Sequence, residues 1–242
     1  MTTSFAGAGW ADTLPVLTPI GDLDRDPDAE RLIGLVEAWQ EAHQEPRIDA
    51  EWFHASSLGK TDAQLIDEYL GRNNDRHDAR LLTIFEYGHQ RDAAWKRYLH
   101  AAGLSVFPDP EDEEARRVTL TALRLTGRCD DVIQLPGEPE PWVFEFKTMG
   151  AYQFGLLREP KPEHVMQCHA YMAGLGLSDA LILVECKNNG ARIGFRIRFD
   201  VALWMQVTTR LRRLRREAER LAKPTRAAFS DAARRKAEAM EV

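Results

Sequence analysis

The sequence predicts an α/β fold in which a central mixed sheet is flanked by helices, with N-terminal helices and a basic C-terminal helical arm. Apolar residues recur at helical spacing up to about residue 101 and alternate with a period of two from Val118 onwards. A long charged helical pattern follows Asp200. The resulting order of helices, three strands, a helix, two strands and a helix suits a layer of strands covered by helices.

Length and composition limit the class of protein. At roughly 100–200 residues per domain, the 242 residues predict a core over 51–200, preceded by a lead-in and helix over 1–50 and followed by a helical extension over 201–242. No apolar run could span a bilayer and no secretion signal is present, so no membrane partner is expected. The widely spaced Cys129, Cys168 and Cys186 indicate a reducing, cytoplasmic setting.

The first third of the chain shows helical patterns. Apolar residues from Leu32 to Trp39 predict an amphipathic helix over 27–44. Ser56 and Ser57 are candidate caps for a short helix over 61–71. A stronger pattern predicts a helix over 78–101.

Strand patterns follow. They predict strands from Val118 to near Gly127, from Cys129 to Leu135 and from Trp142 to Lys147, the last two joined by a proline-rich turn. We then expect a helix over 163–175 that ends at Gly174 or Gly176.

The remaining elements complete the predicted sheet and the C-terminal arm. A buried strand from Ala180 to Cys186 and a hairpin partner from Ile193 to Phe199 are expected. Asp200 should cap a final helix that Pro224 breaks, with another helix over 226–240.

Three polar residues on neighbouring predicted strands form a candidate catalytic group. Glu145 and Lys147 are two apart and share one strand face, while Asp130 lies near the start of the preceding strand. Carboxylates suit Mg²⁺ or Mn²⁺, the carbonyl of Phe146 is a further oxygen ligand, and a metal-bound water beside a lysine can attack a phosphodiester. From these residues alone, a surface hairpin with a Glu–Lys pair is an equal alternative.

Positive charge gathers near the C-terminus, although the whole chain carries a net charge of −6. Between Arg210 and Arg235 there are ten Lys and Arg against three Asp and Glu. Arginines neutralise phosphates without reading sequence, so Arg212, Arg213 and Arg216 are candidate DNA contacts. A solvated helix face explains the same pattern.

The motifs Gly127-x-x-Asp130, Glu145-Phe-Lys147 and Gln167-x-x-x-Tyr171, in this order, resemble the PD-(D/E)XK nuclease superfamily. The branch most similar to this chain is that of the RecB-like exonucleases, including CRISPR-associated and phage-encoded members. The resemblance spans roughly residues 52–200. It implies a restriction-endonuclease-like core, with Asp130 and Glu145 as metal ligands and Lys147 as the catalytic lysine.

The resemblance also assigns helical residues to the site. Gln167 and Tyr171, one turn apart on a helix, would line the active site and contact DNA. The upstream motif of the branch places a histidine four residues after a glycine. After Gly88 that position holds Asp92, a competent ligand for Mg²⁺ or Mn²⁺, with His89 and Glu86 as alternatives.

Many relatives of this branch also hold an iron–sulfur cluster. Thr61 stands where one of the cluster cysteines would fall, and the segment after Pro224 has no cysteine. We therefore expect no iron–sulfur cluster.

The resemblance implies a metal-dependent DNA exonuclease of phage or recombination origin. Its substrate would be single-stranded DNA or duplex ends, and a recombination or replication protein is a candidate partner. Two alternatives are a structure- or site-specific endonuclease and a non-catalytic DNA-binding or assembly subunit that retains the fold. The sequence does not indicate an oligomeric state.

Overall fold

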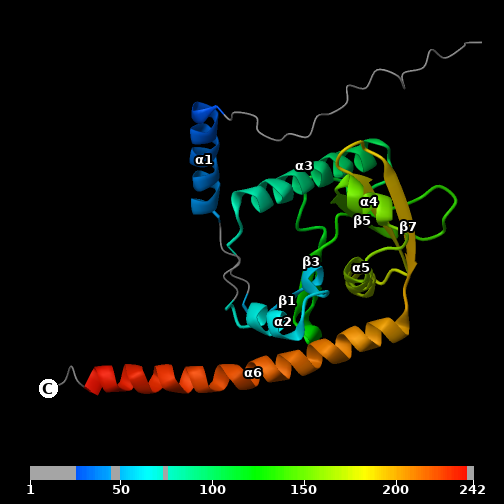
Figure 1. Ribbon diagram of the computed structural model, residues 1–242. Coiled ribbons are helices and arrows are strands. Elements are labelled where there is room, and N and C mark those ends of the chain that lie inside the picture. The colour runs from blue at the N-terminus through cyan, green and yellow to red at the C-terminus, as the bar shows by residue number, and fades with distance from the viewer. Residues whose placement is uncertain (1–25, 45–49, 73–75, 239–242) are drawn as a thin grey trace, which may run out of the picture.

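The computed structural model describes residues 26–44, 50–72 and 76–238 (Figure 1). Its helical elements are α1 (Pro27–Ala42), α2 (Asp62–Tyr69), α3 (Ala79–Ala101), α4 (Ala151–Leu156), α5 (Pro162–Leu175) and α6 (Val201–Glu238). Two short 3₁₀ turns are η1 (Ala55–Ser57) and η2 (Thr121–Leu123). No helix in this part of the chain is long and apolar enough to cross a bilayer.

The strands form two mixed sheets where one was predicted. The first has the order β1-β3-β2, built from β1 (Phe53–His54), β3 (Leu125–Arg128) and β2 (Arg117–Leu120). The second has the order β4-β5-β6-β7, built from β4 (Asp131–Ile133), β5 (Trp142–Met149), β6 (Asp179–Cys186) and β7 (Arg192–Arg198). Only β1–β3 and β5–β6 are parallel pairs. Helices flank both sheets, as predicted.

The predicted strand from Val118 to Gly127 is a hairpin. β2 ends at Leu120, η2 turns the chain, and β3 returns antiparallel to β2. Arg124 takes the turn in the left-handed conformation, with φ 52°. Gly and Asn are the residues that usually adopt this conformation, so a turn at an arginine cannot be predicted from the residue type.

The predicted strand from Cys129 to Leu135 is also shorter than expected, because the chain changes sheets there. The Cys129 amide still donates to the Arg116 carbonyl beside the first sheet, whereas Val132 already pairs with Val143 in the second. Asp130 therefore lies in the bend that joins the two sheets. The position of this bend decides where the acidic side chain points.

Helix boundaries follow capping chemistry. Thr61, and not Ser56 or Ser57, caps α2 through a capping box with Gln64. Asp78 caps α3, and Asp200 accepts from the first amides of α6. Of the two candidate glycines, Gly176 ends α5 with φ 70°.

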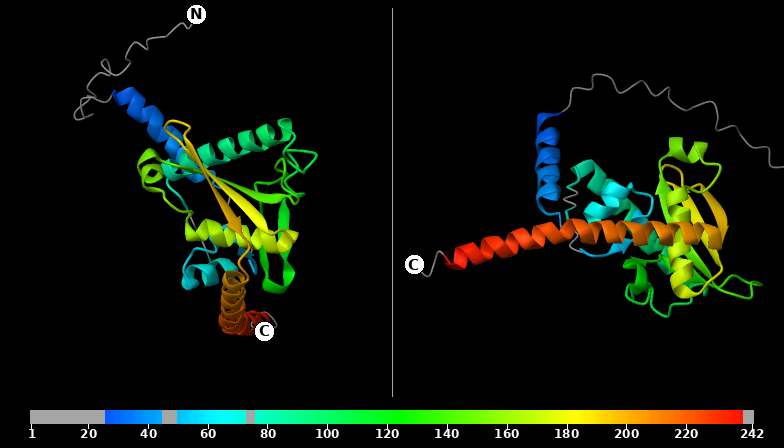
Figure 2. Two further views of the ribbon diagram at one scale, coloured as in Figure 1. Left: turned by 90° about the vertical axis from the view of Figure 1, so that its right-hand side faces the viewer. Right: turned by 90° about the horizontal axis from the view of Figure 1, so that it is seen from below.

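Helix α6 runs unbroken to Glu238, so the predicted break at Pro224 is wrong. A proline removes the hydrogen bond that its own nitrogen would donate. Here Ala227 and Ala228, good helix formers, continue the helix beyond it. Figures 1 and 2 show α6 along one side of the molecule, α3 along the opposite side and α5 between them.

Two apolar clusters cover the two faces of the second sheet. Along β5, Val143 and Met149 face the larger cluster, which includes Tyr171 and Met172 of α5. Phe144 and Phe146 face a smaller cluster that includes Trp95 and Leu99 of α3 and Ile133 of β4. The predicted alternation along β5 is therefore present, and Glu145 and Lys147 point away from the phenylalanines.

Helix α1 forms where predicted but buries none of its side chains within the described part of the chain. Its apolar stripe is exposed at Leu32, Ile33, Leu35, Val36 and Trp39, each by about half or more. Its C-terminal end is tied to α3, because Glu41 accepts from the Ala79 amide and Gln40 reaches Thr83.

Candidate metal and phosphodiester site

The site lies just before β4 begins, where β4 does not pair with the continuing edge of β5. Asp130, in the bend before β4, accepts a hydrogen bond from the Phe146 amide at 2.6 Å through Oδ2. The amide and carbonyl of one strand residue point to the same edge. The Phe146 carbonyl therefore also faces the Asp130 side, as a carbonyl ligand would require.

Glu145 and Lys147 flank that edge on the face opposite Phe146. The Glu145 side chain is fully buried, and its Oε1 lies 2.5 Å from the Lys147 ammonium. Phe146 anchors the strand from behind, with its ring centroid 5.6 Å from that of Trp95. The strand thus holds a carboxylate and an ammonium side by side on an apolar support.

Asp92 reaches the same site from α3. Burial raises the pKa of both Asp130 and Glu145, and the charge of the Asp92 carboxylate raises both in the same direction. Asp92 Oδ2 is 3.0 Å from the ammonium of Lys96. Asp92 Oδ1 and Glu145 Oε2 are buried and accept no hydrogen bond from any described residue. Such open carboxylate oxygens are ligands that a hard divalent cation would use.

The donor set therefore suits Mg²⁺ or Mn²⁺: carboxylate oxygens and one backbone carbonyl, with two lysines nearby. In the described part of the chain, no three His, Cys, Asp or Glu side chains are gathered as tightly as in a ready-made metal centre. Neighbouring carboxylates repel one another without a cation between them, and the lysines take up part of their charge.

Burial and neighbouring charges shift the pKa values of the three central residues of the site. Burial raises the pKa of Asp130 well above its ordinary value, and Glu145 and Asp92 raise it further. Burial likewise raises the pKa of Glu145, against the opposing effect of Lys147. Burial alone would lower the pKa of Lys147, but Glu145 and Asp130 raise it above the ordinary lysine value. The lysine is therefore a fixed positive charge.

The two buried motif residues on α5 lie beneath the site. The Gln167 amide nitrogen donates to the Tyr171 hydroxyl at 2.9 Å, and both side chains are buried. A Cβ on Gly127 would lie 2.9 Å from Cε1 of Tyr171, so the glycine makes room for the tyrosine ring. In this geometry Gln167 and Tyr171 support β3 and the Asp130 bend. Their predicted contact with DNA remains a prediction.

The predicted arginines on α6 divide into two groups. Arg213 forms an ion pair with Asp62. Arg210 pairs with the same carboxylate and also donates hydrogen bonds to the Leu58 and Lys60 carbonyls. Arg212 and Arg216 are exposed and form no ion pair within the described residues. These contacts involve α2 and the loop before it, and none joins α6 to the acidic group.

The alternative ligands on α3 stay apart from the acidic group. His89 is exposed, and Glu86 is exposed and bonds to Gln90 at 3.1 Å. Asp92 is thus the acid of this helix that the structure brings to Asp130 and Glu145. The identity of the ligand remains a prediction.

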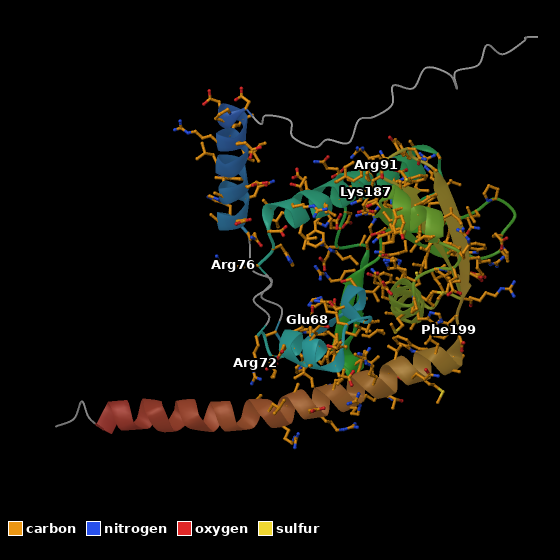
Figure 3. The ribbon with its side chains drawn as sticks, in the orientation of Figure 1. Glu68, Arg72, Arg76, Arg91, Lys187 and Phe199 are labelled. Atoms are coloured by element: carbon orange, nitrogen blue, oxygen red, sulfur yellow. The ribbon has the colours of Figure 1, made fainter. Side chains whose placement is uncertain are left out.

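Sequence reasoning missed the groups that hold α3 in place. Buried Glu185 of β6 accepts two hydrogen bonds from Arg91, at 2.8 and 3.0 Å, and one from Trp95. Figure 3 labels Arg91 where α3 passes the second sheet. Because Arg91 precedes Asp92, this clamp sets the position of the acid. The opposite charges of Asp92 and Lys96, four residues apart, indicate a pair within this helix, but no local pattern indicates the contact between Arg91 and Glu185.

His164, in the first turn of α5, was also missed as a site residue. Burial lowers the pKa of its imidazole to about 4, and the charge of Lys147 lowers it in the same direction. A neutral imidazole therefore lies near the lysine at neutral pH.

Two mixed sheets joined at an acidic bend and flanked by helices form a restriction-endonuclease-like fold, which is the fold that the resemblance to PD-(D/E)XK nucleases implied. A solved structure with a similar fold is the alkaline exonuclease LHK-Exo from Laribacter hongkongensis, with TM-score 0.53 and 17% identity over 75% of this chain and 95% of that one. LHK-Exo in complex with dAMP gives TM-score 0.55 and 18% identity, over 81% and 99%. No family model and no curated protein matches the sequence.

Proposed function

We propose that the protein is a Mg²⁺- or Mn²⁺-dependent deoxyribonuclease that removes nucleotides from DNA ends. The observation that carries this proposal is the grouping of Asp130, Glu145 and Lys147 at the open edge of β5, with Asp92 opposite. The likeness of its fold to that of an alkaline exonuclease supports end-directed cleavage. Processing of DNA ends in phage growth or recombination is the setting that this activity serves.

Asp130, Glu145, Asp92 and the Phe146 carbonyl would hold the cation. When bound, it neutralises phosphate charge, lowers the pKa of the attacking water and stabilises the leaving oxygen. Lys147 contributes a protonated ammonium beside Glu145, where it orients the water and offsets charge that develops on the phosphate. The Asp130–Phe146 hydrogen bond keeps the carboxylate at the strand edge. Tyr171, hydrogen-bonded to Gln167, packs against Gly127 of β3, the strand that leads to Asp130.

The central test uses linear duplex DNA with labelled ends. With Mg²⁺ or Mn²⁺ the purified protein should release nucleotides, and a chelator should stop the release. Lys147→Ala should lower the rate by about 10²–10³-fold, because it removes a charge aimed at the reacting phosphate. Lys187→Ala is the matched control, since Lys187 lies in the β6–β7 turn, where it contacts the Ile84 carbonyl.

The outcomes separate the alternatives. An unchanged rate in Lys147→Ala contradicts the mechanism. Cleavage of covalently closed circular DNA identifies an endonuclease, because a strict exonuclease needs an end. Retained DNA affinity without cleavage, and without heat of Mn²⁺ binding at millimolar concentration, identifies a non-catalytic subunit.

A further inference from the structure

Lys96 is a buried cation beside the acidic site that the proposed mechanism does not use. Only 8% of the residue is exposed. Its ammonium lies 3.0 Å from Asp92 Oδ2 and 3.0 Å from Glu113 Oε1. The other oxygen of Glu113 lies 2.9 Å from Arg128 Nη1. Four alternating charges therefore connect α3, the loop before β2 and the end of β3.

This chain of charges connects the two elements that carry Asp92 and Asp130. Arg128 is the last residue of β3, two positions before Asp130. Lys96 is one turn after Asp92 on α3. Two ion pairs, Lys96–Glu113 and Glu113–Arg128, thus link the helix to the strand that leads to the acidic bend, and a third joins Lys96 to Asp92 within the helix.

The contact with Lys96 also fixes how Asp92 is turned. Oδ2 is held by the ammonium, while Oδ1 is buried and has no hydrogen-bond donor among the described residues. A carboxylate whose one oxygen is held presents the other in a defined direction. Outer partners that orient ligands in this way are typically worth 10–100-fold in metal affinity.

Burial argues that the ion pair persists. A buried charge without a partner costs free energy, so separating Lys96 from Asp92 and Glu113 would destabilise the folded state. Burial opposes the charged form, but Asp92 and Glu113 raise the pKa of Lys96 above the ordinary value. Low exposure also separates Lys96 from arginines such as Arg212, which are free to meet a phosphate backbone.

We propose that Lys96 is a positioning residue that orients the Asp92 carboxylate toward the metal, with Glu113 and Arg128 anchoring it to the strand that leads to Asp130. The inference rests on the proposed function, because it takes Asp92 as a metal ligand. The inference goes beyond the proposed function because it assigns roles to Lys96, Glu113 and Arg128, which lie outside the group of Asp130, Glu145 and Lys147.

A double-mutant cycle on Mn²⁺ binding, measured by titration calorimetry on the full chain, tests this. Lys96→Met keeps the aliphatic stem and removes the charge, and should weaken Mn²⁺ binding by about 10–100-fold. Asp92→Asn should weaken it to a similar extent. If Lys96 acts through Asp92, adding Lys96→Met to Asp92→Asn should change the affinity by less than about threefold, because the two effects are not independent.

A second variant guards against misfolding of the first. Glu113 is about half exposed, so Glu113→Gln leaves the core intact while it weakens the anchor of Lys96. It should weaken Mn²⁺ binding in the same direction by a smaller factor. Lys187→Met is the matched control and should bind Mn²⁺ as the wild type does. In DNA cleavage, Lys96→Met should raise the Mn²⁺ concentration for half-maximal rate and leave the rate at saturating Mn²⁺ within a few fold.

Three outcomes would overturn the inference while the proposed function stands: unchanged Mn²⁺ affinity in Lys96→Met and Glu113→Gln, additive effects in the cycle, or tighter binding in Lys96→Met. The last would mean that Lys96 acts only as a charge that repels the metal. Absence of Mn²⁺ binding by the wild type would overturn the proposed function together with the inference.

Discussion

Glu145 is the residue on which the site depends most directly. Its carboxylate is fully buried, touches Lys147 through one oxygen and leaves the other open. Burying such a group is expensive unless a cation compensates it. Gly127 has an equally specific role, since a side chain at that position would meet the ring of Tyr171. Glu145 thus serves the candidate site directly, whereas Gly127 serves the packing beneath it.

His164 gives a pH-dependent test at the residue scale. Its folded pKa of about 4 lies below the ordinary value of 6.5. The unfolded chain therefore binds a proton that the folded chain excludes between these values, and stability should fall as pH drops from about 6.5 to 4. His164→Gln should flatten this slope by about 1 kcal/mol per pH unit in urea unfolding, because one proton contributes at most about 1.4 kcal/mol per pH unit.

The control for that experiment is His89→Gln, on the exposed side of α3. It should leave the slope of stability against pH as it is in the wild type. Equal slopes for His164→Gln and the wild type would contradict the assignment of a partly buried, neutral imidazole.

At the scale of elements, α6 combines an anchored face with an exposed basic one. Arg210 fastens the helix through Asp62 and the carbonyls of Leu58 and Lys60, so this arginine stabilises the fold. Arg212 and Arg216 point to solvent. A long helix presenting exposed arginines is suited to phosphate contacts that carry no sequence information.

We expect Arg212→Ala with Arg216→Ala to weaken binding of a DNA oligonucleotide uniformly across sequences. Each lost phosphate contact should reduce the slope of log affinity against log salt by about 1. Fluorescence anisotropy at several salt concentrations measures both quantities. Arg210→Ala should instead lower thermal stability, because buried carbonyls lose a charged donor. An unchanged salt slope in the double variant would assign these arginines to a solvated helix face.

At the scale of the whole molecule, the site forms where three parts of the chain meet. Asp92 comes from α3, Asp130 from the bend between the two sheets, and Glu145 from the second sheet. A cation held by all three would tie these parts together and stabilise the folded state by mass action. If these acids bind a cation, the buried carboxylates lower the stability of the metal-free protein and the bound cation restores it.

Mn²⁺ should accordingly raise the unfolding free energy by about 2.7 kcal/mol at one hundred times its dissociation constant. The shift, measured by thermal unfolding with Mn²⁺ and with chelator, should disappear in Glu145→Gln. Glu86→Gln and His89→Gln are matched controls on α3 and should keep it. Loss of the shift in either control, with retention in Asp92→Asn, would transfer the ligand role from Asp92 to that residue.

The sequence by itself determined the α/β class, most helices and strands, and the alternation that puts Glu145 and Lys147 on one face, because these depend on local periodicity and capping. Only the tertiary structure decided that the strands form two sheets, that Asp130 sits in the bend between them, and that Arg213 faces Asp62. Contacts such as Asp62–Arg213 and Lys96–Glu113 join residues far apart in the chain or on different elements. The direction of a side chain at a sheet junction depends on where strand pairing stops. Here the left-handed turn at Arg124 and the hydrogen bond from the Cys129 amide to the Arg116 carbonyl decide that point, and neither is visible as a local sequence pattern.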